Sequence, residues 1–145
     1  MSKENERKSV KSSAKYVIIS VLTIKRGDEM NRYIPFVSRD KCCKIMLSDI
    51  LYIEQNKREV LIVTEEETFR RYGKLSELES YLDERFFFCL KTLVINFSNV
   101  VSMKDQTIKF LNGEEIFLGR QNFVRTKQSF AVFIKKACNS NGFVV

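Results

Sequence analysis

The chain has 145 residues, of which 44% are hydrophobic and 12% aromatic, which suits one domain with a substantial core and excludes a disordered chain. Its net charge of +7 predicts attraction to polyanions such as nucleic acid or anionic lipid. Histidine is absent, which excludes Ser-His and Cys-His nucleophile pairs and histidine metal ligands. We therefore predict no catalytic residue and no cofactor, and an enzyme is the weakest interpretation.

The four cysteines, Cys42, Cys43, Cys89 and Cys138, contain no C-x-x-C pair, which disfavours an all-cysteine zinc site. Adjacent Cys42 and Cys43 point to opposite sides if they lie on a strand. The sequence shows neither a signal peptide nor an apolar segment long enough to cross a bilayer. We therefore expect a cytoplasmic protein with reduced thiols and no bound metal.

The first part of the chain is polar and basic. Residues 1–15 are rich in lysine and serine, which is typical of a solvated arm, and a basic arm that contacts a phosphate backbone is the alternative. Residues 16–25 are rich in β-branched side chains and predict a strand, which Gly27 and Asp28 end with a turn. The only proline, Pro35, is expected at a strand edge or a bulge.

Two apolar runs, 50–54 and 60–64, flank the polar turn Asn56–Glu59 and predict a hairpin with Lys57 and Arg58 at its tip. After an acidic turn at 65–67 and a strand at 69–72, leucines recur with the period of a helix. The residues that predict this short helix and a capping box at its start are Leu75, Leu78, Leu82, Ser76 and Glu79. We expect the helix to cover the sheet.

The last third of the chain alternates strand-like runs with turns. Phe86, Phe87 and Phe88 cannot all face one way on a strand, so one is expected to pack on the helix side. Asn112–Gly113 lies between two apolar runs and predicts a two-residue hairpin. A closing helix at 120–137 is predicted from apolar residues on one face, namely Phe123, Phe130, Ile134 and Ala137.

Four pieces occur in a characteristic order: "DILYIE", the "L-x-E-L" helix, "F…C-x-x-T-L-V-I-N" and "NGEEIFLGR". With them the chain resembles the LytTR-type DNA-binding domain family from about Ile34 to about Lys136. The resemblance implies an elongated, mostly β fold of short antiparallel strands with one short internal helix and a C-terminal helix. The chain is then expected to divide into an arm with an extra strand at 1–30, a LytTR-like domain at 31–138 and a tail at 139–145.

The resemblance also implies a transcription regulator that reads major grooves of promoter DNA from loops, commonly at direct repeats. Where the family shows a His-Arg-Ser-like triplet, this chain has Leu90, Lys91 and Thr92, which keep a cation and a hydroxyl but lose the imidazole. Arg120 matches the family's late base-contacting arginine. The predicted DNA-binding residues are Asn56, Lys57, Arg58, Lys91, Thr92, Arg120 and Gln121. The alternative for each cation is an ordinary solvent-facing residue of a turn or a helix start.

About thirty residues precede Ile34, too few for the receiver domain of a typical response regulator of this family, so a stand-alone member is expected. Its implied partners are double-stranded DNA, an inhibitory membrane protein of the kind paired with some stand-alone members, and further copies of itself on DNA. Two alternatives stay open. One is an RNA-binding β module, and the other is a protein-interaction module whose basic face meets an acidic partner.

Overall fold

The structure is a computed structural model, and it describes residues 32–140. The predicted arm, the strand at 16–25 and the turn at Gly27–Asp28 lie outside the described residues, as do residues 141–145. Within the described part, short strands form a two-stranded, a three-stranded and a five-stranded sheet. This confirms the predicted mostly β fold with a short internal helix and a C-terminal helix.

The elements in chain order are β1 Tyr33–Val37, β2 Cys42–Met46, η3 Leu47–Asp49, β3 Ile50–Asn56, β4 Glu59–Thr64, β5 Thr68–Tyr72, η4 Leu75–Tyr81, β6 Phe86–Leu90, β7 Leu93–Asn96, η5 Phe97–Asn99, β8 Val100–Lys104, β9 Thr107–Phe110, β10 Glu115–Phe117 and α2 Arg120–Ser140. The five-stranded sheet has the order β5-β4-β3-β7-β6, and the three-stranded sheet has the order β10-β9-β8. Pro35 is exposed on β1 of the two-stranded sheet, where both strands are edge strands, as predicted.

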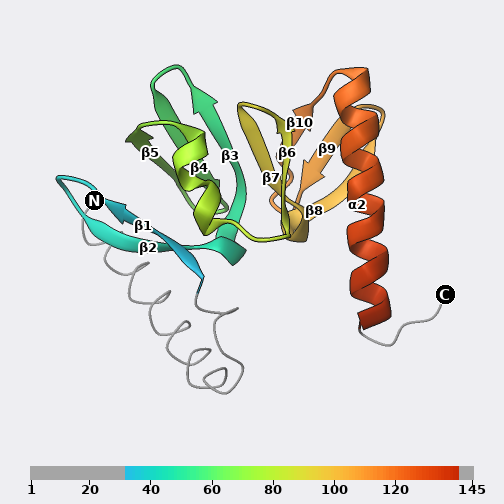
Figure 1. The fold of residues 1–145 in the computed structure, drawn as a ribbon, viewed down its shortest axis with the longest axis horizontal. Coiled ribbons are helices and arrows are strands. Elements are labelled where there is room, and N and C mark those ends of the chain that lie inside the picture. The colour runs from blue at the N-terminus through green and yellow to red at the C-terminus, as the bar shows by residue number, and fades with distance from the viewer. Residues whose placement is uncertain (1–31, 141–145) are drawn as a thin grey trace. The chain divides into compact units, whose positions relative to one another are not determined.

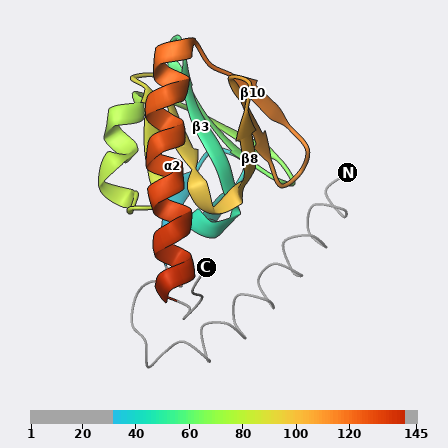
Figure 2. The ribbon, with the colours of Figure 1, turned by 90° about the vertical axis from the view of Figure 1, so that its right-hand side faces the viewer.

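Alternation along the strands of the five-stranded sheet builds a core on each of its faces. On β6, Phe86 and Phe88 pack on the first core and Phe87 packs on the second, as the consecutive aromatics predicted. The first core includes residues of β1, β2 and η4, and the second includes residues of β8, β9 and α2. Figures 1 and 2 show η4 and α2 beside this sheet. The predicted role of the internal helix as a cover for the sheet is confirmed, since Leu75 and Leu78 are buried in the first core.

Three local predictions need correction, and the first concerns the internal helix. It is a 3-10 helix, and the predicted Ser76–Glu79 capping box is wrong. The helix begins earlier, because Gly73 has a φ of 137° and turns the chain sharply. The amide of Lys74 donates to Oε1 of Glu77 at 3.3 Å.

The second correction concerns the hairpin at Asn112–Gly113, which exists but has a longer loop. The amide of Phe110 donates to the carbonyl of Glu114 at 2.9 Å, so Leu111–Gly113 form a three-residue loop with Gly113 at a φ of 92°. The cause is Glu114, whose amide is held by Oδ1 of Asn112 and whose carboxylate accepts a 2.6 Å hydrogen bond from the hydroxyl of Tyr52.

The third correction concerns α2. Phe123 and Phe130 are buried as predicted, but Ile134 is 44% exposed and Ala137 is exposed. The helix continues to Ser140 and its last turns extend beyond the core.

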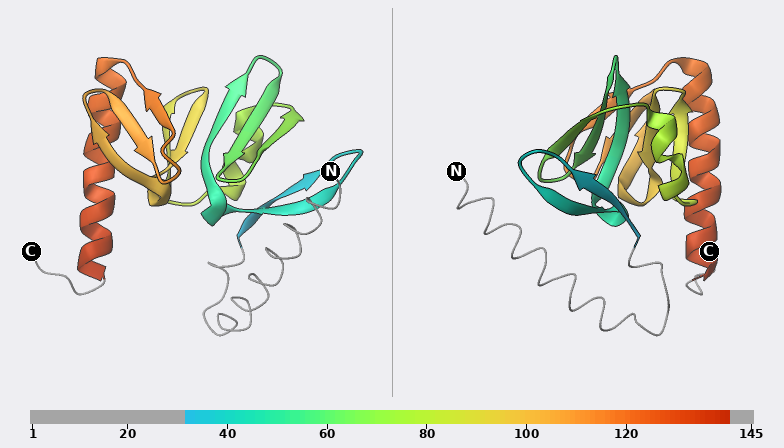
Figure 3. Two further views of the ribbon diagram at one scale, coloured as in Figure 1. Left: turned by 180° about the vertical axis from the view of Figure 1, so that it is seen from behind. Right: turned by 60° about the vertical axis from the view of Figure 1, so that its left-hand side comes forward.

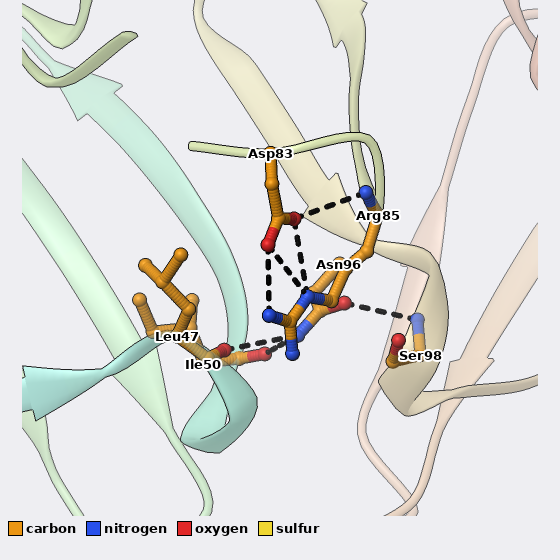
Figure 4. Close-up of polar contacts among 6 residues, drawn as sticks. All are labelled: Leu47, Ile50, Asp83, Arg85, Asn96 and Ser98. Carbon is orange, nitrogen blue, oxygen red and sulfur yellow. Dashed lines mark hydrogen bonds and ion pairs between the residues drawn. The ribbon is translucent and has the colours of Figure 1, made fainter. Parts of the chain in front are cut away.

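One end of the five-stranded sheet is closed by buried amides. Nδ2 of Asn96 donates to the carbonyls of Leu47 and Ile50 at 3.1 and 2.8 Å, and its Oδ1 accepts from the amide of Ser98 at 2.9 Å (Figure 4). Nδ2 of Asn99 donates to the carbonyl of Ile50 at 2.8 Å. These bonds, called here the amide junction, tie the turn before β3 to the turn after β7. Sequence analysis missed both asparagines.

Candidate nucleic-acid interface

The predicted contact turns lie at the end of the sheet opposite the amide junction. β3 runs from the junction to Asn56, and β7 starts beside it at Leu93 and runs back. The amide of Gln55 donates to the carbonyl of Thr92 at 2.8 Å, which joins the β3–β4 and β6–β7 turns directly. Figures 1 and 3 show these turns and the start of α2 at one end. We call it the turn edge; its exposed predicted members are Asn56, Lys57, Arg58, Lys91, Thr92, Arg120 and Gln121.

The β3–β4 turn is held in a constrained conformation. Asn56 pairs with Glu59, which leaves Lys57 and Arg58 as a two-residue loop. Lys57 has a φ of 60°, a left-handed conformation that is uncommon for a side chain of this kind. Nε2 of Gln55 donates to the carbonyl of Lys57 at 3.0 Å and helps to fix the turn. Both cations of the loop are exposed, so a hydrogen-bonded turn presents two charged side chains to solvent.

The β6–β7 turn explains why an apolar run carries Lys91 and Thr92. Leu90 pairs with Leu93, so these two polar residues form the exposed loop of a hairpin whose flanking strands are core. Arg125 of α2 holds this turn from the side. Its Nη2 donates to the carbonyl of Cys89 at 2.7 Å and to that of Phe88 at 3.2 Å.

The same arginine has a further contact that limits its freedom. Its guanidinium carbon lies 5.1 Å from the centroid of the Phe87 ring, a cation–π arrangement. Arg125 is therefore engaged by the protein through both its hydrogen bonds and this ring contact. Its role is to fix the end of β6 against α2.

Arg120 and Gln121 are exposed at the first turn of α2. The segment before them is fixed by Gln106, whose carbonyl accepts from the amide of Leu118 and whose Nε2 donates to the carbonyl of Leu118, both at 2.9 Å. Gln106 and Asp105 form the β8–β9 turn with φ values of 62° and 53°. A constrained turn thus sets the position from which Arg120 projects, and neither residue of that turn was singled out by sequence.

Two spatial relations bring the predicted residues together. The Asn56–Arg58 and Lys91–Thr92 turns are neighbours through a direct backbone bond, as described above. The start of α2 approaches the second turn across an open groove of about 590 Å³. The groove is lined by Ser76, Glu79, Phe88, Cys89, Leu90, Lys91, Asn122 and Arg125. The positioning residues that sequence analysis missed are Gln55, Gln106 and Arg125, because each acts through bonds to distant backbone.

Burial perturbs the pKa of two groups inside the domain. It raises the pKa of the Cys89 thiol to about 11, so this thiol is protonated near neutral pH. It also raises the pKa of Tyr52, with a further contribution from the hydrogen bond to Glu114. All four cysteines are free thiols, with Cys42 exposed and Cys43 half-buried, as expected for neighbours on a strand.

The part of the chain that the structure describes, residues 32–140, contains no group of three or more cysteine or carboxylate side chains placed to hold a metal ion. Nor does any helix among these residues have the length and apolar character needed to cross a membrane.

The described residues thus form a mostly β domain whose predicted basic turns gather at one end of the five-stranded sheet. The profile of the LytTr DNA-binding domain family matches residues 40–131, and the chain belongs to this family. The fold resembles a solved LytTr DNA-binding domain from Bacillus cereus, with a TM-score of 0.53 and 20% identity over 72% of this chain and 94% of that one.

The curated relatives come from Staphylococcus epidermidis. Accessory gene regulator protein A from two strains of this organism is 33% identical over 82 residues, which cover 54% of this chain. The match covers 34% of the length of those proteins. Family membership therefore makes this chain a DNA-binding protein of the kind used in transcription regulation.

Proposed function

We propose that this protein is a sequence-specific transcription regulator that binds double-stranded DNA and reads the major groove from the turn edge. The observation that carries the proposal is the pairing of the Lys57–Arg58 and Lys91–Thr92 turns through the Gln55–Thr92 backbone bond. Both turns project exposed cations from neighbouring hairpins of a rigid sheet. The name of the Staphylococcus epidermidis relatives, a gene regulator, supports the regulatory part.

The spacing of the hairpins suits this task. β4, β3, β7 and β6 are consecutive strands, so the centres of the two hairpin turns lie about 10 Å apart, or roughly two strand spacings. The major groove of B-DNA is about 12 Å wide, comparable with this distance. Two neighbouring turns can therefore meet one groove together, with the start of α2 alongside.

The exposed side chains suit two kinds of DNA contact, to bases and to phosphates. Arg120 has the fork that matches O6 and N7 of guanine, while the amides of Asn56 and Gln121 match N6 and N7 of adenine. Lys91 and Thr92 suit phosphate oxygens, which fix the register of the protein on the duplex. We expect binding at direct repeats. The inhibitory membrane partner, self-association on DNA and cytoplasmic localisation stay predictions.

The test is selection of genomic DNA fragments by the purified full-length chain. We expect enrichment of a repeated half-site and tighter binding to that duplex than to either of its single strands or to the corresponding RNA. Enrichment of no sequence, with equal or tighter binding to single-stranded RNA, would favour the RNA-binding alternative. A chain that binds no nucleic acid but captures an acidic protein from lysate free of nucleic acid would favour the interaction module.

A further inference from the structure

A fourth turn, Tyr72–Lys74 between β5 and η4, is tied to the β3–β4 turn. The amide of Gly73 donates to the carbonyl of Arg58 at 3.0 Å. The side chain of Gln55 connects the same two segments, since its Nε2 donates to the carbonyls of Gly73 and Lys57, both at 3.0 Å. The Tyr72–Lys74 turn is therefore fixed at the turn edge, although neither the sequence nor the family match singles it out.

Gln55 also fixes the element that follows this turn. Its Oε1 accepts a 2.6 Å hydrogen bond from the amide of Leu75, the first residue of η4. Gly73 cannot be replaced easily, because its φ of 137° is a backbone conformation that residues with a Cβ rarely adopt. Several hydrogen bonds hold the backbone of the turn, which limits the entropy lost when its side chains bind a ligand.

The exposed chemistry of the turn suits a phosphate. Tyr72 is 77% exposed at the end of β5, which is unusual for a large aromatic side chain. Lys74 is exposed, and among residues 32–140 no carboxylate forms an ion pair with its ammonium group. A phenol hydroxyl and an ammonium group are both donors to phosphate oxygens.

Nearby carboxylates do not cancel this charge. Oε1 of Glu77 lies 3.6 Å from Nη2 of Arg71, and Oε1 of Glu59 lies 3.3 Å from Nη1 of Arg70. Glu59 and Glu77 thus each have a basic partner of their own. The positive charge of Lys74 remains available to an anion, next to the cations of the β3–β4 turn.

We propose that the Tyr72–Lys74 turn is a further DNA-contacting element, in which Lys74 and the Tyr72 hydroxyl hold a backbone phosphate beside the groove that the β3–β4 turn reads. Gln55 is its positioning residue. This inference rests on the proposed function. Since β5 lies next to β4, the contact extends the footprint by about 5 Å, one strand spacing, beyond the hairpin.

The test is competitive titration of the full chain on its selected duplex and on a scrambled duplex across a range of salt concentrations. Loss of one phosphate contact flattens the slope of log K against log salt by about 0.9, which corresponds to roughly five- to ten-fold weaker binding at 0.1 M salt. We expect Lys74→Ala to show this change on both duplexes. Tyr72→Phe should weaken binding less, by about two- to three-fold, since a neutral donor to phosphate is weaker than an ammonium group.

The matched control is Lys136→Ala. Lys136 is an exposed lysine near the far end of α2, about 24 Å along the helix from Arg120. Gln55→Met removes the bonds of the side chain with little change in volume. We expect this variant to lose as much affinity as Lys74→Ala. It should also discriminate less between the two duplexes, because the β3–β4 turn loses its hydrogen bond to Gln55 as well.

The outcomes separate this inference from the proposed function. A wild-type chain that prefers no duplex contradicts the proposed function itself. The other outcome concerns the Tyr72–Lys74 turn alone. If the wild-type chain prefers the selected duplex but Lys74→Ala matches Lys136→Ala in affinity and salt slope, the proposed contact of this turn is overturned and the proposed function stands. If Gln55→Met does not fold, as circular dichroism would show, Lys74→Ala and Tyr72→Phe still decide, since both side chains are exposed.

Discussion

The two ends of the five-stranded sheet use the same kinds of side chain for opposite purposes. At the amide junction, Asn96 is fully buried and all its hydrogen-bonding groups are engaged by backbone. At the turn edge, Asn56 is exposed on a hairpin end. The contrast teaches that an asparagine at a strand end becomes structural when it is buried with backbone partners, and available for recognition when it is not.

The largest expected effect concerns the junction. Asn96→Ala removes the donors to the carbonyls of Leu47 and Ile50 and the acceptor for Ser98, which should lower the free energy of unfolding by about 3 kcal/mol. Asn56→Ala is the matched control and should change it by less than about 0.5 kcal/mol. Urea denaturation measures both. Equal losses in the two variants would remove the distinction between the ends.

A smaller effect is expected at Arg125. This residue shares features of both kinds of residue, because it is exposed like Asn56 yet bonded to backbone, that of β6, like Asn96. Arg125→Met should lower the free energy of unfolding by about 1–2 kcal/mol through loss of charged hydrogen bonds. It should also reduce sequence discrimination, because the Lys91 turn is no longer held against α2. Thermal unfolding and duplex titration check this. An unchanged stability with altered binding would instead make Arg125 a direct DNA contact.

Lys91 tests the phosphate role at the turn edge. Lys91→Ala should leave unfolding unchanged, weaken binding to all duplexes similarly and flatten the salt slope by about 0.9. Fluorescence anisotropy at several salt concentrations measures the slope. Changed sequence preference with an intact slope would assign Lys91 to a base instead.

The smallest effect concerns alkaline pH. Cys89 has a pKa raised from 9.0 to about 11 in the folded chain, so the folded state binds the proton more tightly than the unfolded state. Stability should therefore fall as pH rises above 9, by about 1 kcal/mol between pH 9 and 10. The stability of Cys89→Ala should fall less than that of the wild type between pH 9 and 10. Parallel pH dependence in denaturation of both proteins would show that the thiol does not contribute.

Much of this fold could be predicted from sequence, because alternation and turn residues act locally. The Lys57–Arg58 hairpin and the opposite faces of Phe86 and Phe87 followed from period-two patterning. Errors arose where a distant side chain decides a local conformation. The start of η4 depends on Gln55, 20 residues earlier, and the loop before Glu114 depends on Tyr52, 62 residues earlier.

The candidate site likewise contains residues that the sequence predicted and residues that it did not. Exposed cations at turns are visible in the sequence, and the family resemblance indicated which turns to consider. The residues that fix those turns could not be found, because a glutamine or an arginine that bonds to backbone carbonyls has no sequence signature. The Tyr72–Lys74 turn became a candidate only when the bond between Gly73 and Arg58 placed it at the turn edge.

Sequence reading by Arg120 tests the central claim most directly. Competitive titration on the selected and the scrambled duplex compares wild type, Arg120→Ala, Arg120→Lys and the control Lys136→Ala. We predict that folded Arg120→Ala loses about 1–3 kcal/mol on the selected duplex and less on the scrambled one. Arg120→Lys should rescue this poorly, because a point charge does not reproduce the guanidinium fork. A folded Arg120→Ala that keeps full discrimination would contradict the account of the turn edge as the reader of DNA sequence.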